Sequence, residues 1–221
     1  MPAFHPRWLD LPAEFPVFPL ADALLLPRGR LPLNIFEPRY LAMVEDALGA
    51  GRMFAMIQPD PQQPEGPAGP GLYRIGCLGR LAAFSETDDG RFLITLTGLA
   101  RFNVAAELAM RRGYRRVRGD FSPYPTDLDL SPGPMGIERD ALLGALRGYF
   151  ARRKFEANWD AVRRIPDDAL VTTLSMICPF APAEKQALLE AATEADRAAI
   201  LLTLLQMGAA EPDPSAPRPA S

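Results

Sequence analysis

The chain has 221 residues, of which 48% are hydrophobic and 23% charged, a composition typical of a folded globular protein. Its formal net charge of −3 argues against the basic surface that nonspecific binding of nucleic acid or anionic lipid requires. No apolar run approaches the ~20 residues needed to cross a bilayer, and residues 1–7 lack the pattern of a secretory signal. We therefore expect a cytoplasmic protein without a membrane span.

The first half of the chain predicts short β-strands separated by prolines and glycines. Apolar runs at 17–20 and 30–36 contain prolines, which cannot donate to a β-ladder, so we expect these runs at sheet edges or strand ends. Pro38 then opens a helix whose apolar residues recur at helical spacing until Gly49 or Gly51. One face of that helix is expected to pack on the core.

Further strand patterns cover residues 53–57, 73–84, 92–97, 101–104 and 114–121. A loop rich in Pro and Gly, without periodicity, fills 58–71. Gly76 and Gly79 inside one strand pattern indicate a bulge or a close backbone approach. The segment 87–90 predicts a hairpin turn, because its Asp-Gly pair supplies the positive φ angles that tight turns need.

From Ser131 onward, helical periodicity replaces the strand patterns. A first apolar stripe consists of Ile137, Ala141, Leu142, Leu146, Tyr149 and Phe150. Gly144 and Gly148 interrupt it, each at a cost of about 1 kcal/mol relative to Ala, so we expect a close helix neighbour there.

Three more helices are predicted from their first and last residues. Asp167 is expected to cap a helix that ends before Pro179, and Pro182 to start the next. The segment 193–196 resembles a capping box for a last helix, which is expected to stop at Gly208.

These patterns divide the chain into three parts. We expect a mostly β subdomain at 1–126, a helical bundle at 127–210 and a disordered tail at 211–221.

Several short sequence motifs follow one another along the chain. They are Phe18-Pro19-Leu20, Leu26-Pro27, Leu31 to Tyr40 with Met43, Ile75 to Gly79, Asp89 to Phe92, Gly98 to Phe102, and Glu184 to Glu190. In this order they resemble the N-terminal, substrate-binding domain of Lon proteases.

That resemblance implies an α+β fold, with a PUA-like β pseudo-barrel followed by a C-terminal α-helical bundle. It also implies a non-enzymatic module that recognises unfolded or damaged polypeptide or acts as an adaptor, with a protease or chaperone as a further partner. We expect a stand-alone protein without the ATPase and protease domains of Lon. Apolar surface between barrel and bundle, or strand addition at an exposed edge, would bind the polypeptide.

Residues that nucleotide hydrolysis or histidine chemistry would need are missing. The only lysines are Lys154 and Lys185, and neither follows a glycine, so the sequence contains no P-loop. His5 is the sole histidine, which argues against a Ser-His-Asp arrangement and against a multi-histidine metal site. Cys77 and Cys178 have no CxxC spacing and are interpreted as free buried thiols.

The remaining polar groups have structural interpretations as well. A Ser-Lys dyad would require one of Ser85, Ser122, Ser131 and Ser175 beside a lysine, and these serines are typical of turns and helix surfaces. A hairpin turn accounts for Asp88-Asp89, and a helix cap accounts for Asp167-Asp168. We expect no catalytic residue, no metal and no cofactor.

A basic run, Arg111 to Arg118, supports an alternative function. On a PUA-like barrel its arginines and Tyr114 could bind RNA. The other interpretation is a strand whose arginines face solvent and acidic neighbours in turn, which the acidic overall charge favours. Arg152 to Lys154 fit a helix C-terminus, and Arg118-Gly119-Asp120 matches an integrin-recognition triplet by coincidence.

The family-like motifs contain four polar or amphipathic residues, Glu37, Arg39, Tyr40 and Arg101. They could line a ligand surface. They could instead fasten the predicted helix to the barrel through hydrogen bonds and an ion pair, since buried charges must be partnered. The pattern alone assigns no binding residue and no oligomeric state.

Overall fold

The computed structural model describes residues 6–129 and 136–210. The described residues divide into two compact units, one made of 6–129 with 176–190 and the other of 136–175 with 191–210. The described strands are β1 (Glu14–Pro19), β2 (Arg30–Ile35), β3 (Met53–Ile57), β4 (Ile75–Glu86), β5 (Phe92–Arg111) and β6 (Tyr114–Asp120). The helices are a 3-10 turn (Trp8–Asp10), α1 (Pro38–Gly49), α2 (Arg139–Arg153), α3 (Trp159–Arg164), α4 (Asp167–Ile177), α5 (Pro182–Glu190) and α6 (Glu194–Ala210).

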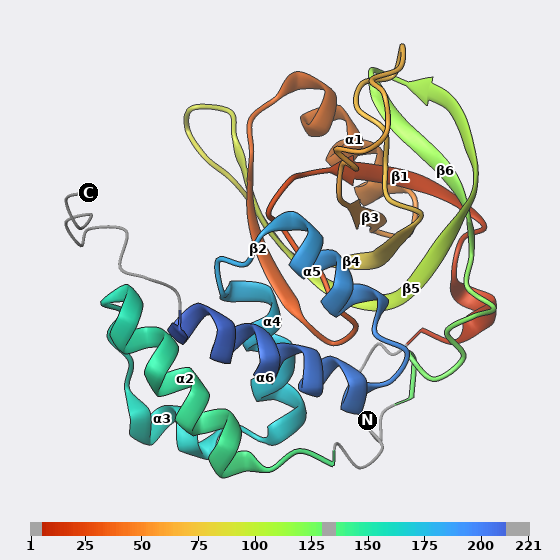
Figure 1. The fold of residues 1–221 in the computed structure, drawn as a ribbon. Helices are drawn as coiled ribbons and strands as arrows, with labels where there is room; N and C mark the ends of the chain where they lie inside the picture. Colours follow the sequence, from red (N-terminus) through yellow and green to blue (C-terminus); the bar gives the residue numbers. More distant parts are fainter. Residues whose placement is uncertain (1–5, 130–135, 211–221) are drawn as a thin grey trace, which may run out of the picture. The chain divides into compact units, whose positions relative to one another are not determined.

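The strands of the first unit form a closed barrel to which one edge strand is added (Figure 1). The hydrogen-bonded order is β2-β5-β4-β3-β1-β6, and a further pairing between β5 and β6 closes the ring. Only β1 and β3 run parallel; the other described pairs are antiparallel. The predicted α+β class, with its β pseudo-barrel, is confirmed.

The barrel closes because β5 is 20 residues long and changes partners along its length. Its first part lies between β2 and β4, where Leu96 faces both Leu31 and Leu81. Its last part pairs with β6 from Asn103 onward. Register shifts in its pairing with β4 and with β6 let the strand bend, as β-bulges do. One of them lies between Leu78 and Gly79, beside one of the two glycines at which the sequence predicted a bulge or a close backbone approach.

Gly98 does not interrupt β5, although the sequence pattern breaks there. A Cβ atom at this position would lie 2.0 Å from the carbonyl oxygen of Leu26. The backbone of Gly98 also donates to the carbonyl of Gly29 at 2.9 Å. The strand therefore continues because this residue has no side chain, which lets the segment before β2 lie directly against it.

The core of the first unit lies inside the barrel. Phe15 and Phe102 meet edge to face at its centre, with ring centroids 4.8 Å apart. Their apolar neighbours are Val17, Met53, Ala55, Ile57, Leu72, Leu78, Leu99, Ala100, Val117 and Leu128. The predicted helix and the 87–90 hairpin are also confirmed, with α1 beginning at Pro38 and Gly90 at φ +76°.

In the second unit, α2 and α6 pack through small residues. A Cβ atom on Gly148 would lie 3.4 Å from Ala209, which confirms the close neighbour predicted there. The same prediction is wrong for Gly144, which has nothing within 4 Å among the described residues. Gly208 does not end α6: it lies against the ring of Tyr149, and the helix continues to Ala210.

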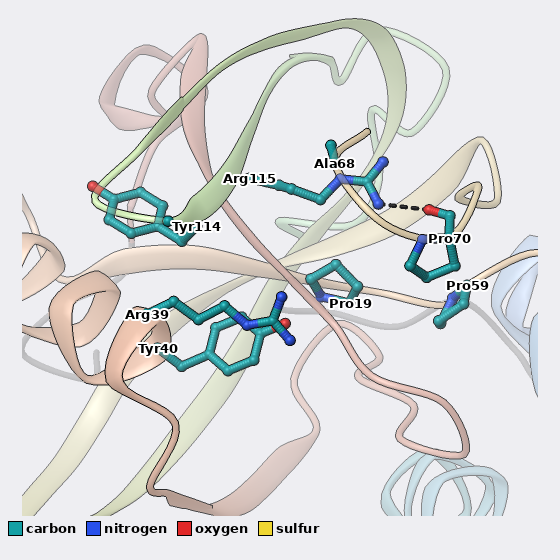
Figure 2. Close-up of a pocket in the computed structure, with 9 residues that line it drawn as sticks. Pro19, Arg39, Tyr40, Pro59, Ala68, Pro70, Tyr114 and Arg115 are labelled. Atoms are coloured by element: carbon teal, nitrogen blue, oxygen red, sulfur yellow. Dashed lines mark hydrogen bonds between the residues drawn. The ribbon is translucent and has the colours of Figure 1, made fainter. Parts of the chain in front are cut away.

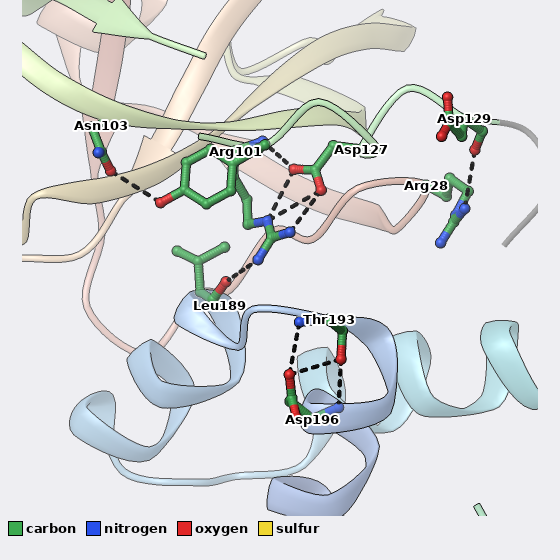
Figure 3. Close-up of polar contacts among 9 residues, drawn as sticks. Arg28, Arg101, Asn103, Asp127, Asp129, Leu189, Thr193 and Asp196 are labelled. Carbon is green, nitrogen blue, oxygen red and sulfur yellow. Dashed lines mark hydrogen bonds and ion pairs between the residues drawn. The ribbon is translucent and has the colours of Figure 1, made fainter. Parts of the chain in front are cut away.

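Two predicted helix caps have different outcomes. Thr193 and Asp196 exchange hydrogen bonds between side chains and backbone amides, which confirms the capping box of α6 (Figure 3). Asp167 is the first residue of α4 rather than its cap, and its carboxylate pairs with Arg139. The short helix α3, capped by Asn158, has no counterpart among the predicted elements.

Gly98→Ala should lower the free energy of unfolding of the first unit by about 3 kcal/mol, because the added methyl group has to displace backbone. Urea denaturation followed by tryptophan fluorescence and circular dichroism would measure the change. Gly49→Ala, with nothing within 4 Å of the new methyl group, is the matched control and should change stability by less than ~1 kcal/mol. Equal losses in the two variants would contradict this account of Gly98.

Candidate functional site

A small open pocket of about 80 Å³ lies on the first unit (Figure 2). The end of β1, the first turn of α1, the turn from β5 into β6, and the 58–71 loop line it. The lining residues are Pro19, Arg39, Tyr40, Pro59, Ala68, Pro70, Gly113, Tyr114 and Arg115. Two arginines and two tyrosines therefore meet at a wall that is otherwise made of proline rings and small residues.

Tyr40 and Arg39 form one side of this pocket. The Tyr40 ring is 5% exposed and packs on Phe18, with centroids 4.1 Å apart. The Arg39 guanidinium lies 4.6 Å from the centre of the Tyr40 ring and pairs with Glu37 at 2.8 Å. Burial raises the pKa of the Tyr40 hydroxyl, an effect that the positive charges of Arg39 and Arg115 oppose.

Arg115 forms the opposite side and holds the 58–71 loop. Its side chain is 8% exposed and donates hydrogen bonds to both oxygens of the Glu107 carboxylate, the shortest at 2.7 Å. Its Nη1 donates to the carbonyl of Pro70 at 2.6 Å, as Figure 2 shows. One buried guanidinium thus joins β5, β6 and the loop.

Two carboxylates of α1, Asp46 and Glu45, fasten the turn between β5 and β6 to this helix. Asp46 accepts hydrogen bonds from the Tyr114 hydroxyl at 2.6 Å and from Arg112 at 2.9 Å, and it pairs with Arg111 at 3.2 Å. The bond from Tyr114 lowers the pKa of the Asp46 carboxyl, and the two arginines add to this. Burial, together with that bond, raises the pKa of Tyr114 to about 12.

The fastening role expected of Glu37 and Arg39 therefore belongs to other residues. Glu37 and Arg39 pair with each other at the start of α1, so they do not join α1 to the barrel. Asp46 connects α1 to the β5–β6 turn, a role that the sequence pattern did not indicate. The one available signal was an acidic residue on the predicted helix combined with a surplus of arginines in the 111–118 run.

The basic run is not the single strand that the RNA-binding alternative assumed. Arg111 ends β5 and Tyr114 begins β6, so the run crosses a hairpin turn. Each of its arginines has a carboxylate partner: Asp46 for Arg111, Glu45 and Asp46 for Arg112, Glu107 for Arg115, and Glu14 for both Arg116 and Arg118. Four carboxylates of the same unit therefore pair with these five arginines, and the RNA-binding alternative is not supported.

Arg101 does fasten a helix to the barrel, but the helix is α5 (Figure 3). Its guanidinium and the Asp127 carboxylate are 4% and 6% exposed and make contact at 2.8 Å. A further guanidinium nitrogen donates to the carbonyl of Leu189 at the end of α5, at 3.2 Å. The same guanidinium lies 4.5 Å from the centre of the Tyr124 ring. Three separate segments, β5, the loop that contains Tyr124 and Asp127, and α5, thus meet at one buried cation.

The other predicted chemical groups are structural where they are described. Cys77 and Cys178 are free and buried, as expected. Lys185 donates to the carbonyl of Asp22, and burial lowers the pKa of its ammonium group. Asp89 accepts from Thr87 within the hairpin. His5 and Ser131 lie outside the described residues.

Side chains that could bind a metal ion are dispersed over the described residues. Among residues 6–129 and 136–210, no three His, Cys, Asp or Glu side chains are grouped so that they could hold a metal ion. In the same part of the chain no helix is long and apolar enough to cross a membrane.

A second surface feature is the edge ribbon, which we define as β2 with residues 92–97 of β5 and 81–86 of β4. Its exposed apolar side chains are Phe36 at 61%, Leu93 at 48% and Phe84 at 40%. Leu93 and Phe84 point to opposite faces, because Phe84 shares a row with Ile94, the residue after Leu93. The ribbon thus presents apolar groups on both faces, beside a strand with no second partner among the described strands.

These features define a class: a β-barrel binding domain with an accompanying helical unit. The family model of the ATP-dependent protease La (LON) substrate-binding domain matches residues 14–207. The chain belongs to this family of substrate-binding domains.

Relatives and solved structures agree with this assignment. Lon protease 1 of Thermus thermophilus is 26% identical over 87% of this chain, and a Lon protease of Anaeromyxobacter dehalogenans is 28% identical over 49%. The matches span 24% and 13% of those proteins. The Lon N-terminal domain protein from Xanthomonas campestris has the same fold, with a TM-score of 0.55 and 21% identity over 86% of this chain and 97% of its own. The N-terminal domain of the Mycobacterium avium complex Lon protease gives 0.56, with 15% identity over 87% and 97%.

Asp127→Asn should destabilise the first unit by about 3 kcal/mol, because it leaves the Arg101 guanidinium buried without a counter-charge. Chemical denaturation would measure the loss. The control is Asp10→Asn, which breaks the exposed pair with Arg7 and should leave stability almost unchanged. The double variant Arg101→Met with Asp127→Leu should recover much of the loss, and the prediction is contradicted if the double variant is no more stable than Asp127→Asn.

The lowered pKa of Asp46 predicts a pH dependence of stability. Since the pKa is lower in the folded chain than in the unfolded one, the contribution is present above about pH 4 and is lost as pH falls through the folded value. Unfolding free energies measured from pH 6 down to pH 2 should therefore fall less steeply in Asp46→Asn than in the wild type. Identical slopes in wild type and Asp46→Asn would exclude this role.

Proposed function

We propose that this chain binds extended, unfolded polypeptide at the edge ribbon and carries out no chemical step on it. The observation that carries the proposal is the coincidence of an open strand edge with exposed apolar side chains. Phe36 directly follows β2, while Leu93 and Phe84 lie on the two strands beside it. Membership of a substrate-binding family supports the same conclusion.

Strand addition explains why such a surface suits unfolded chains of varied sequence. An edge strand offers backbone N–H and C=O groups, which any extended segment can pair with regardless of its side chains. Pro32 in β2 has no N–H, so the edge offers a broken row of donors. The apolar side chains add affinity for segments that a folded protein would bury, and together these features favour weak, broad recognition.

The side-chain chemistry supports binding alone. The buried ion pair, the capped helices and the neutralised arginines each have a structural partner. We propose that the chain acts as an adaptor that presents polypeptide to a protease or chaperone. The two free buried thiols suit a reducing, cytoplasmic location.

Fluorescence anisotropy with a labelled, permanently unfolded protein would test the binding. The double variant Phe36→Ser with Leu93→Ser should weaken the affinity about tenfold, because it removes most of the exposed apolar contact, worth on the order of 1–2 kcal/mol. Backbone amides of β2 should become protected from hydrogen exchange when the polypeptide is bound. The labelled protein should be recovered uncleaved from the mixture.

Met110→Ser is the matched control, because Met110 lies on the same strand as Leu93 and is 51% exposed. It should leave the affinity unchanged. Binding that responds equally to both changes, or that leaves β2 unprotected, would place the polypeptide elsewhere. Absence of binding at high micromolar concentration by a natively folded chain would end the proposal.

A further inference from the structure

The pocket beside α1 contains a polar group that the fold does not use. Tyr40 is 5% exposed, and its hydroxyl has no hydrogen-bond partner among the described residues, although it lies at the lining of the pocket. Its ring is held by Phe18 on one side and by Arg39 on the other. The side chain is thus fixed in place, and its hydroxyl at the pocket is a donor that a bound group can use.

The charged groups of the lining have one sign. Arg39 and Arg115 reach the pocket from opposite sides in Figure 2, and no carboxylate belongs to the lining. Glu37 accepts from Nε and Nη2 of Arg39, which leaves Nη1 without a bond to the described residues. Tyr114 lends only its ring, because its hydroxyl is bonded to Asp46. The side chains of the lining therefore present hydrogen-bond donors and no carboxylate, so a group that complements them is an acceptor.

The volume of the pocket and the residues that line it restrict which acceptor group can bind there. A cavity of about 80 Å³ holds one small group, and the rings of Pro19, Pro59 and Pro70 provide an apolar wall for the carbon atoms next to it. A purely apolar side chain in this place would leave the Tyr40 hydroxyl unpaired, whereas a carboxylate accepts from the hydroxyl and the guanidinium together.

We propose that this pocket binds a carboxylate carried by a polypeptide, from its C-terminus or from an Asp or Glu side chain. The inference rests on the proposed function only in that the carrier is a polypeptide. Phe36, at the end of the edge ribbon, precedes Arg39 by three positions in the chain, so one extended segment can reach both. The pocket would then select bound segments by charge, which the edge ribbon alone does not do.

Isothermal titration of the full chain with four versions of one short unstructured peptide would test the pocket. The versions have a free C-terminus, an amidated C-terminus, an amidated C-terminus with one internal Glu, and the same with Gln. The free acid or the Glu peptide should bind about tenfold more tightly than its neutral counterpart, as a charge-assisted hydrogen bond predicts. Whichever carboxylate gives the gain identifies the source.

Tyr40→Phe should abolish that gain and leave the affinity for the neutral peptides unchanged, since the ring and its packing remain. Arg39→Gln should reduce the gain as well. Tyr124→Phe, which removes a hydroxyl bonded to Asn103 outside the pocket lining, should have no effect. Equal binding of acid and neutral peptides, or a gain that survives Tyr40→Phe, would overturn the proposal and leave the polypeptide-binding function intact.

A small probe separates the two proposals further. Chemical-shift changes in ¹⁵N-labelled protein should appear at Arg39, Tyr40 and Arg115 on addition of N-acetylalanine, and not on addition of its amide. If the small acid produces these shifts while no peptide binds at all, the proposed function fails and the pocket remains a carboxylate site. If the acid and the amide behave alike at these residues, the pocket has no preference for a carboxylate.

Discussion

The β-rich unit depends on a single long strand that has to change partners. β5 pairs with β2 and β4 over its first part and with β6 over its last, and the barrel closes only because it does both. Its passage past Leu26 requires a residue without a side chain, which Gly98 supplies. Three residues further along the same strand, Arg101 donates hydrogen bonds to Asp127 and to the carbonyl of Leu189 at the end of α5. Closure and the attachment of α5 are thus consequences of one strand's course.

Closure also leaves β2 as an edge. The ring of β5, β4, β3, β1 and β6 satisfies its own ladders, whereas β2 pairs on one side alone among the described strands. An edge of this kind is usually protected by charge or by proline. Here Pro32 interrupts the edge, and Phe36 and Leu93 stay exposed beside it. Such a surface would invite aggregation in another protein, and it is the surface at which we propose that extended polypeptide binds.

Arginines are used in this unit as structural cross-links. Arg115 joins a loop to two strands, Arg112 joins the hairpin to α1, and Arg101 joins α5 to the barrel. Each guanidinium suits the task because it donates in several directions from one rigid plane. Since carboxylates on neighbouring elements neutralise these charges, the basic run in the sequence does not become a basic binding surface. The arginines of this run are adjacent in sequence, but in the structure they pair with carboxylates on different elements and do not form the shared binding surface that the RNA hypothesis assumed.

Local patterns predicted much of the fold. The Pro38 helix, the strand at 53–57, the Asp-Gly hairpin and the Thr193 capping box depend on neighbouring residues, and all were confirmed. Gly98 and Gly144 were misjudged because only a distant segment decides whether a glycine is crowded. The partners of Arg101 and the 111–118 run were missed for the same reason.

The amino-acid sequence by itself determined the family, the α+β class, the positions of most elements and the pairing of polar residues close in the chain. These depend on periodicity, turn chemistry and caps, which act over a few residues. Only the tertiary structure decided that β5 closes the barrel, that β2 remains an edge, and that Tyr40, Arg39 and Arg115 share a pocket. The physical reason is that long-range contacts bring together groups more than a hundred residues apart, as Arg118 and Glu14, 104 positions apart, show. No local pattern carries that information.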